Sequence, residues 1–237
     1  MTKTEPSEDW DPGAYARFQD LRLRPGLDLL NAIAAFGPGD TVDLGCGNGA
    51  LSSALRHRAA ERSLIGVDTS PAMLAEARET KNYARLETAD IATWEPASPV
   101  SVIFSNAALH WLDGHDRLMP RLASFLVSGG TLAVQMPHQN KAPSHRVWLT
   151  LAQELFPGRV APANAPGVMT PQDYEAALAP LGHFRLWETE YYQRLLPEPD
   201  AHPVRRFTES TYARPILQEL APDERTNLIT RYEEVMR

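Results

Sequence analysis

The 237-residue sequence contains a single cysteine, Cys46, which excludes an internal disulfide and a zinc site built on cysteines. A membrane-spanning helix needs about 18 consecutive apolar residues, and no apolar run in the sequence approaches that length. Residues 1–11 are polar and acidic, and they lack the basic and apolar regions of a signal peptide. These absences predict a protein of the cytoplasm that has no membrane partner.

Lysine is also scarce, and the formal net charge is −7. Binding to nucleic acid needs a basic surface that neutralises phosphates, so this charge argues against it. The composition is 43% hydrophobic, and no repeat or low-complexity segment is present, which is typical of a globular protein. We therefore expect one domain over residues 1–237 that acts on a small molecule.

Predicted strands and helices alternate in the first part of the chain. This pattern is typical of a doubly wound α/β fold with a mostly parallel sheet. The predicted strands cover residues 41–44, 64–68, 84–89, 100–104 and 131–136. The predicted helices cover residues 25–36, 50–60 and 115–126, and one more begins at the capping residue Ser70 and Pro71.

The pattern changes after residue 136. Residues 137–182 are proline-rich and predicted to be mainly helical, with one helix starting at Thr170. An alternating stretch then predicts a long strand over 184–195, and the last segment is predicted to be helical. Segments of this kind often cover a ligand crevice. We therefore expect a cofactor-binding core over 25–136 and a helical cap for substrate over 137–183 and 199–237.

A glycine-rich turn, Gly45 to Gly49, follows the first predicted strand. With Ala50 it fits the G-x-G-x-x-G/A pattern, which nicotinamide and flavin nucleotide sites also satisfy. The first glycine permits a tight turn, and the second lets the backbone approach a ligand. Asp68, at the end of the second strand, can accept hydrogen bonds from both ribose hydroxyls. These residues alone suit either a dinucleotide or S-adenosylmethionine.

Three further features favour S-adenosylmethionine over a dinucleotide. Asp43 stands beside the glycine turn, where a carboxylate would repel a pyrophosphate but attract the ammonium of a methionine moiety. Asp90 and Ile91 close the third strand and can present an acceptor and an apolar contact to adenine. Residues 106–111 close the fourth strand with a polar and aromatic edge. A nicotinamide oxidoreductase is the third-ranked alternative.

The sequence Val42 to Gly49 resembles motif I of class I S-adenosylmethionine-dependent methyltransferases, and the order and spacing of motifs match through Gln135. Further stretches are similar to the trans-aconitate methyltransferase family and follow its order. They are Asp9-Trp10-Asp11-Pro12 with Tyr15, Phe18, Arg22, Arg24 and Pro25; Asp68 to Met73; Asn106 to Leu112; Val134 to Pro137; Pro143-Ser144-His145; Glu190-Tyr191-Tyr192; and Arg214-Pro215.

The resemblance implies a Rossmann-like class I methyltransferase fold that binds S-adenosyl-L-methionine. It implies transfer of a methyl group to a carboxylate of trans-aconitate or a similar small polycarboxylic acid, giving a monomethyl ester. The cofactor-binding residues that it implies are Asp43, Gly45, Cys46, Gly47, Asp68, Thr69, Met73, Asp90, Ile91 and Asn106. The substrate-binding candidates are the clamps Arg22, Arg24, Tyr191, Tyr192 and Arg214 and the crevice wall of His110 and Trp111.

No metal site is predicted, because no acidic residue completes a ligand set with the histidines at helical spacing. A carboxylate is ionised at neutral pH and needs no general base, which agrees with the lack of a catalytic triad. The alternatives are a methyltransferase for another small acceptor and a truncated cofactor-binding paralogue without turnover.

The sequence departs from the family at two places. Ile216 stands where the family usually has an aromatic residue, and the chain stops at Arg237, before the family's last antiparallel strand. From this second departure we expect the sheet to have an uncovered edge beside residues 184–195. The expected consequence is either lower stability or self-association through that edge.

Overall fold

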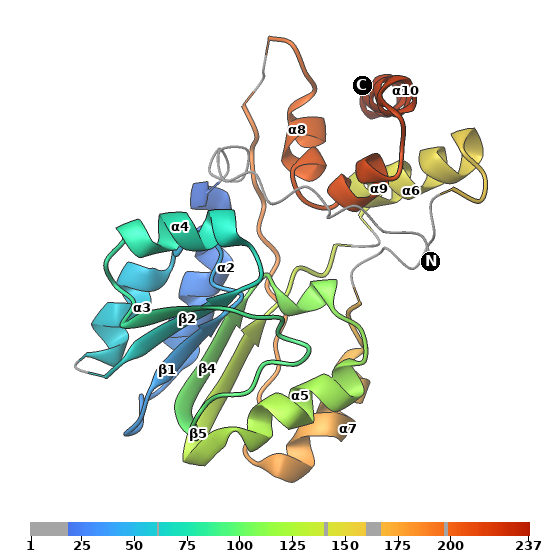
Figure 1. The fold of residues 1–237 in the computed structure, drawn as a ribbon. Coiled ribbons are helices and arrows are strands. Elements are labelled where there is room, and N and C mark those ends of the chain that lie inside the picture. The colour runs from blue at the N-terminus through green and yellow to red at the C-terminus, as the bar shows by residue number, and fades with distance from the viewer. Residues whose placement is uncertain (1–18, 61, 140–141, 160–166, 197–198) are drawn as a thin grey trace, which may run out of the picture. The chain divides into compact units, whose positions relative to one another are not determined.

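The computed structural model describes residues 19–60, 62–139, 142–159, 167–196 and 199–237, with the side chains of residues 19–22 left aside. The chain divides into two compact units (Figure 1). The first contains residues 1–136 and 169–186, and the second contains residues 137–168 and 187–237. The stretch 169–183, which the sequence analysis assigns to the cap, is part of the first unit.

The first unit is built on a five-stranded sheet whose strand order is β3-β2-β1-β4-β5. All of its strand pairs are parallel, which confirms the predicted doubly wound fold. The order reverses direction between β1 and β4, and ligands of such sheets bind at the carboxyl ends of the strands beside this point. The strands are β1 (Thr41–Leu44), β2 (Leu64–Asp68), β3 (Arg85–Thr88), β4 (Val100–Asn106) and β5 (Leu126–Gln135).

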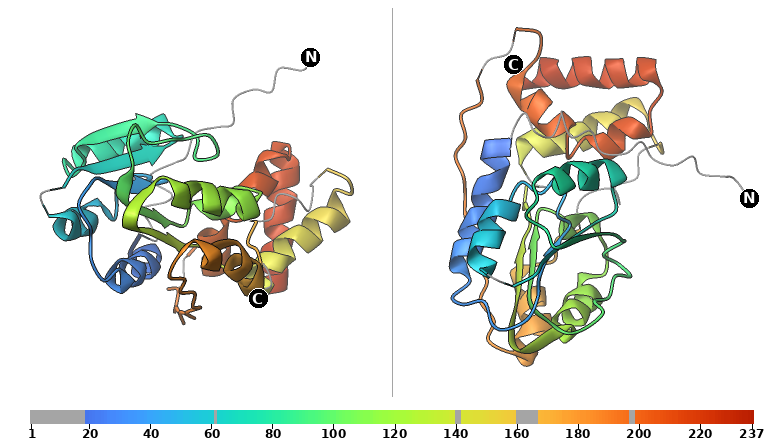
Figure 2. Two further views of the ribbon diagram at one scale, coloured as in Figure 1. Left: turned by 90° about the horizontal axis from the view of Figure 1, so that it is seen from below. Right: turned by 60° about the vertical axis from the view of Figure 1, so that its left-hand side comes forward.

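Helices cover both faces of this sheet (Figure 2). Helices α2 (Gln19–Ala32) and α3 (Ser52–Ala59) pack on one face, where Leu30 and Leu55 join a buried cluster with Val102 and Phe104 of β4. Helix α4 (Pro71–Glu79) contacts β2 and β3. Helix α5 (His115–Ser124) lies on the other face, and α7 (Pro171–Leu178) packs against α5 (Figure 1). This unit also contains two 3-10 turns, η1 (Leu109–Trp111) and η3 (Ala179–Leu181).

Proline marks the start of most helices, because it needs no amide partner in the first turn and has a helical φ. The first residues of five helices are Pro71, Pro143, Pro171, Pro203 and Pro222. The hydroxyls of Ser70 and Thr170 cap α4 and α7 by accepting hydrogen bonds from Met73 and Asp173. Both predicted helix starts are confirmed. The predicted helix over 25–36 has the wrong bounds, because Pro25 lies inside α2.

The second unit is helical, with α6 (Pro143–Leu155), α8 (Pro203–Glu209), α9 (Arg214–Gln218) and α10 (Pro222–Met236). At its centre, the rings of Trp148 and Tyr232 stack with their centroids 4.0 Å apart. The Trp148 Nε1 donates a 2.8 Å hydrogen bond to the hydroxyl of Thr208. The hydroxyl of Tyr232 donates a hydrogen bond of 2.8 Å to the carbonyl of Ser144. This stack joins α6 to α10.

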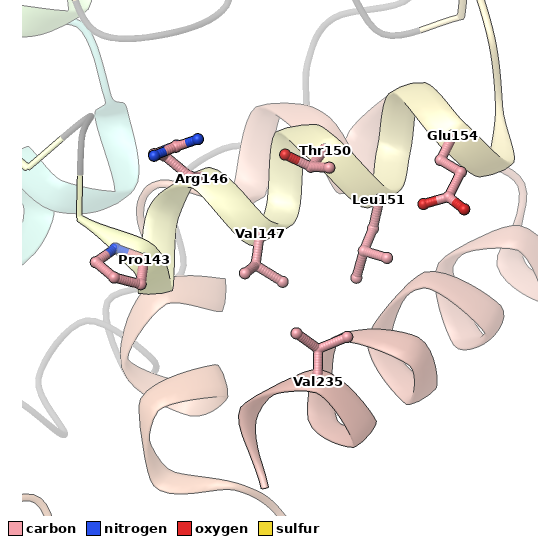
Figure 3. A pocket seen from close by; sticks show the side chains of 7 residues that line it. All are labelled: Pro143, Arg146, Val147, Thr150, Leu151, Glu154 and Val235. Atoms are coloured by element: carbon pink, nitrogen blue, oxygen red, sulfur yellow. The ribbon is translucent and has the colours of Figure 1, made fainter.

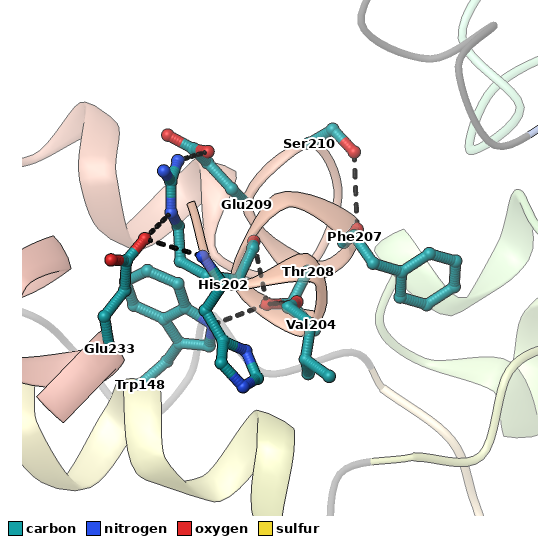
Figure 4. A network of polar contacts seen from close by, with 9 residues as sticks. Trp148, His202, Val204, Phe207, Thr208, Glu209, Ser210 and Glu233 are labelled. Carbon is teal, nitrogen blue, oxygen red and sulfur yellow. Dashed lines mark hydrogen bonds and ion pairs between the residues drawn. The ribbon is translucent and has the colours of Figure 1, made fainter. Parts of the chain in front are cut away.

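A polar network ties α8 to α10 within the same unit (Figure 4). The buried guanidinium of Arg205 pairs with Glu209 on its own helix and with Glu233 of α10, at 2.7 Å for the second pair. Glu233 also accepts a hydrogen bond of 3.2 Å from the amide of His202. The buried cation is thus compensated by two carboxylates, as burial of a charge requires.

The long strand predicted over 184–195 is wrong. Residues 183–196 form neither helix nor strand, and large apolar side chains within them, such as Trp187 and Leu196, are exposed. An alternating sequence becomes a strand only where a neighbouring strand supplies hydrogen-bond partners for its backbone. Within the described residues, no strand pairs with this stretch. Self-association through a sheet edge stays a prediction.

Candidate cofactor and substrate site

The glycine turn lies at the carboxyl end of β1. The amides of Gly45 and Cys46 both donate hydrogen bonds to the carbonyl oxygen of Val67, at 2.8 and 3.0 Å, which fixes the turn to β2. Gly45 has φ +78°, and a Cβ added there would lie only 2.2 Å from the Cβ of Ala108. Glycine is therefore required at this position both by its conformation and by the close approach of the loop that follows β4.

The next glycine in the turn faces open space. Gly47 has φ +53°, and a Cβ there would meet no atom within 4 Å. Its amide donates a 2.8 Å hydrogen bond to Oδ2 of Asp68, and Oδ1 of Asp68 accepts one of 2.9 Å from the amide of Ser70. Asp68 thus joins the turn to the start of α4. A carboxylate oxygen has two acceptor positions, so a carboxylate is a suitable group for accepting ribose hydroxyls.

Asp43 is buried behind the turn, at 3% exposure. The hydroxyl of Tyr83 donates a 2.6 Å hydrogen bond to its Oδ2. The pKa of Asp43 is raised to about 7, because burial and, to a smaller extent, the charge of Asp68 raise it by more than the hydrogen bond from Tyr83 lowers it. Burial also raises the pKa of the Cys46 thiol, well above its ordinary value. Cys46 is therefore a protonated, packed side chain of the turn rather than a nucleophile.

A second turn, at the end of β3, places Ile91 against the glycine turn. Ile91 is buried, and its Cδ1 lies 3.4 Å from the position of a Cβ on Gly45. Arg121 of α5 donates hydrogen bonds to the carbonyls of Ile91 and Trp94, at 2.7 and 2.8 Å. Asp90 is exposed, and its Oδ1 accepts a 2.8 Å hydrogen bond from the Ala92 amide within the same turn.

The end of β4 and the loop after it carry two buried polar atoms that have no hydrogen-bond partner among the described residues. They are Oδ1 of Asn106 and Nδ1 of His110. Burial lowers the pKa of His110 to about 4, with the nearby His115 adding to the effect, so its imidazole is neutral at pH 7. The ring of Trp111 lies 4.6 Å from that of His110. Unpartnered buried polar atoms are costly unless a ligand or water completes them.

His115 and Tyr174, which were not among the residues predicted from sequence, stabilise this loop through hydrogen bonds. Nε2 of His115 lies 2.8 Å from the carbonyl oxygen of Leu109, and Nδ1 lies 2.6 Å from the hydroxyl of Tyr174. The carbonyl only accepts, so Nε2 carries the hydrogen of that bond, and in this tautomer Tyr174 donates to Nδ1. Both side chains are buried. No motif marks them, because their role comes from the packing of α7 on α5.

The remaining cofactor candidates lie near Asp68. Thr69 is exposed. Met73 is buried in α4, and its amide donates to the Ser70 hydroxyl at 3.2 Å. Contacts therefore bring together the ends of four strands: Gly47 with Asp68, and Gly45 with Ile91 and Ala108. The open face at Gly47 and the unpartnered Asn106 oxygen fit a cofactor with ribose, adenine and amino-acid groups.

The structure divides the predicted substrate clamps between the two units. Arg22 and Arg24 lie on α2 in the first unit, where Arg24 is exposed and the side chain of Arg22 is not among those described. Tyr191, Tyr192 and Arg214 belong to the second unit. Tyr192 is 89% exposed and donates a hydrogen bond of 3.1 Å to Glu190. The motif residues 9–12, Tyr15 and Phe18 lie outside the described residues.

The second unit has an open groove between α6 and α10, with a volume of about 390 Å³ (Figure 3). Leu151 of α6 and Val235 of α10 point toward one another across it (Figure 3). The other residues that line it are Pro143, Arg146, Val147, Thr150 and Glu154. None of the predicted cofactor or substrate residues lines this groove.

Comparison with known proteins decides the family. A methyltransferase-domain family matches residues 41–130. A trans-aconitate 2-methyltransferase of Methylobacterium nodulans is 38% identical over 229 residues, which cover 95% of this chain and 88% of the relative. The enzyme of that name from Klebsiella pneumoniae is 36% identical, with 96% and 88% covered. The chain belongs to the trans-aconitate 2-methyltransferase family. It is therefore an S-adenosylmethionine-dependent methyltransferase.

The fold of this trans-aconitate 2-methyltransferase family member also matches solved structures. A methyltransferase in complex with the Haloferax volcanii Trm112 activator aligns with a TM-score of 0.57 at 19% identity, covering 84% of this chain and 88% of that one. At this identity the likeness concerns the fold. Within the described residues, no helix is both long and apolar enough to cross a bilayer.

Proposed function

We propose that this methyltransferase transfers a methyl group from S-adenosylmethionine to a carboxylate of trans-aconitate, or of a similar small polycarboxylic acid, and releases a monomethyl ester. The observation that carries the proposal is the 36% to 39% identity, over nearly the whole chain, to relatives named trans-aconitate 2-methyltransferase. The site described above supports it, because it combines a cofactor cradle with a polar wall and has no evident nucleophile of its own.

The chemistry asks little of the protein. Methyl transfer is an in-line displacement at a carbon that the positive sulfur of the cofactor activates, so alignment and exclusion of water are the main tasks. An ionised carboxylate attacks without a general base. His110 is neutral at pH 7 and is suited to donate a hydrogen bond from its ring rather than to remove a proton.

In this proposal the cofactor lies along the carboxyl ends of the strands. Asp68 accepts the ribose hydroxyls, and Ile91 and Asp90 flank the adenine. The open backbone at Gly47 admits the cofactor's close approach. Asp43 attracts the methionine ammonium, directly or through water. Asn106, whose Oδ1 has no partner among the described residues, completes its hydrogen bonding with the bound molecule.

The acid is held by cations and hydrogen-bond donors. We propose His110 and Trp111 as the wall of the acceptor site, and Arg22, Arg24 and Arg214 with Tyr191 and Tyr192 as clamps. A guanidinium binds a carboxylate through two parallel hydrogen bonds, which a lysine cannot reproduce. Replacing a clamping arginine by lysine should therefore raise the KM for the acid even though the charge is kept.

Mass spectrometry of small acids after incubation with S-adenosylmethionine tests the proposal. Trans-aconitate should gain one methyl group, and cis-aconitate and citrate serve as matched acceptors that differ in shape but not in the number of carboxylates. Turnover of an amine or phenol in place of any acid would show a methyltransferase for another acceptor. Cofactor binding without product from any acceptor would show a protein that binds the cofactor without turnover.

A further inference from the structure

Tyr83 lies in the loop between α4 and β3, outside every sequence motif. Its ring packs against Gly66 of β2 and Gly49 of the glycine turn. A Cβ on Gly66 would lie 2.9 Å from its Cε1, and a Cβ on Gly49 would lie 3.1 Å from its Cε2. Burial raises the pKa of its hydroxyl above the ordinary value, so the group is a hydrogen-bond donor at every working pH. Its acceptor is Oδ2 of Asp43 at 2.6 Å.

This contact determines how the Asp43 carboxylate is oriented. Asp43 is 3% exposed, so water cannot compensate for a lost partner as it would at the surface. The two side chains are 40 residues apart in sequence, and the register of the sheet places Asp43 beside Gly66, the residue that leaves room for the Tyr83 ring. The sheet and the loop together hold the hydroxyl at the carboxylate.

We propose that Tyr83 is a positioning residue for S-adenosylmethionine: by donating to Oδ2 of Asp43, it holds this carboxylate ionised and oriented for the methionine end of the cofactor. This inference rests on the proposed assignment of Asp43 to the methionine ammonium. Tyr83 itself touches neither the reacting carbon nor the acceptor. It acts through Asp43.

Protonation provides a readout that a purely structural role would not give. The groups that face Asp43 are Tyr83 from the loop after α4, Asp68 from the end of β2 and the thiol of Cys46 in the glycine turn. The pKa of Asp43 is raised to about 7 by burial and by Asp68, against the lowering effect of the hydrogen bond from Tyr83. Affinity for an ammonium-bearing ligand should therefore fall as pH drops through about 7. Without the hydroxyl, the midpoint of this change should move to higher pH.

The test is calorimetric titration of the full chain from pH 6 to pH 9. S-adenosylhomocysteine carries the ammonium, and 5′-methylthioadenosine shares the adenosine part but lacks the amino acid. Tyr83→Phe should weaken S-adenosylhomocysteine about tenfold at pH 7.5 and leave methylthioadenosine unchanged. Tyr232→Phe is the matched control, since its hydroxyl bonds to Ser144 in the second unit and its loss should alter neither ligand.

Asp43→Asn separates the two levels of the proposal. If Asp43→Asn leaves S-adenosylhomocysteine affinity unchanged, the assignment of Asp43 is wrong, and the role of Tyr83 fails with it. If Asp43→Asn weakens binding but Tyr83→Phe does not, or if Tyr83→Phe weakens both ligands equally, only the role of Tyr83 is overturned.

Thermal melts verify that each variant is folded. Should Tyr83→Phe not fold, the unmodified protein still decides: an affinity for S-adenosylhomocysteine that does not change between pH 6 and 9 overturns the proposal, and a midpoint near 7 that methylthioadenosine lacks supports it.

Discussion

Oδ2 of Asp68 accepts the amide hydrogen of Gly47 at 2.8 Å, so the carboxylate that is proposed to bind ribose also closes the glycine turn. Asp68→Ala should therefore weaken S-adenosylmethionine binding by about 1–3 kcal/mol, the scale for loss of charge-assisted hydrogen bonds. Calorimetry measures the loss.

Methionine alone is a control ligand for this change because it has no ribose, and its weaker binding should respond less to Asp68→Ala than that of S-adenosylmethionine. Undiminished affinity for S-adenosylmethionine in the variant would contradict the assignment of Asp68. Tighter binding of NAD than of S-adenosylmethionine by the unmodified protein would contradict the reading of the whole turn.

Alanine substitutions at three glycines with positive φ separate strain from ligand contact. Gly47 and Gly129 have φ +53° and +75°, and a Cβ on either meets nothing within 4 Å. Each change should cost about 1–2 kcal/mol of stability through backbone strain alone. Only Gly47→Ala should also weaken S-adenosylmethionine binding, because its methyl projects from the turn. Gly45→Ala should be the most destabilising, since its Cβ would lie 2.2 Å from that of Ala108. Melting curves and titrations of all three variants check this order, and equal affinities for Gly47→Ala and Gly129→Ala would contradict it.

Tyr174→Phe should act on the acceptor rather than on the cofactor. Without the hydroxyl, Nδ1 of His115 is left buried and unpaired, at a cost of about 1–3 kcal/mol. Without this anchor the His115 ring can rotate and weaken its hydrogen bond to the Leu109 carbonyl, which loosens the turn that carries His110. The KM for the acid should rise while the affinity for S-adenosylhomocysteine is kept. Tyr212→Phe is the control, because its buried hydroxyl has no hydrogen-bond partner among the described residues. A change in cofactor affinity alone would refute this role of Tyr174.

Acidification should destabilise the second unit through His145. Burial lowers the pKa of His145 from 6.5 to about 4, so the folded state binds fewer protons than the unfolded chain between these values. The stability associated with the neutral ring is complete above pH 6.5 and is lost as pH falls toward 4, by on the order of 2–3 kcal/mol. Asp43 acts in the opposite direction, because its pKa is raised, so the comparison must be between variants. His145→Gln should lose less stability than the unmodified protein on this descent, and the exposed His57→Gln should behave as unmodified. Identical losses in His145→Gln and the unmodified protein would contradict the prediction.

The parallel sheet could be predicted because its signals are local. Strands β1, β2 and β4 are short, mainly apolar and buried runs, and Ser70 with Pro71 starts a helix by chemistry that needs no tertiary contact. The prediction of a strand over 184–195 was wrong because an alternating pattern does not specify a partner strand. Among the described residues, no strand pairs with this stretch. The predicted start of the first helix at Pro25 was wrong for a related reason. Proline usually marks a helix start, but here α2 begins before Pro25 and continues through it.

The same division applies to the site. Glycines and carboxylates at the ends of strands could be found from spacing, because parallel strands bring their carboxyl ends to one edge. Tyr83, His115 and Tyr174 could not, since each acts through a partner at least six residues away along the chain or in another element. The Asp90 side chain was expected at adenine, but its Oδ1 also serves its own turn, a role that sequence does not distinguish from ligand binding.

Gly66 is needed for space and not for its conformation. A Cβ there would lie 2.6 Å from Leu86 and 2.9 Å from Tyr83, and no left-handed φ is involved. Positions 66 and 83 should therefore evolve together: relatives with a side chain at position 66 are expected to carry a smaller residue at position 83, and to orient the carboxylate at position 43 by another donor. A gain of bulk in the middle of β2 would thus be accepted only by lineages that had already replaced the tyrosine and in which the side chain at position 86 had moved or become smaller.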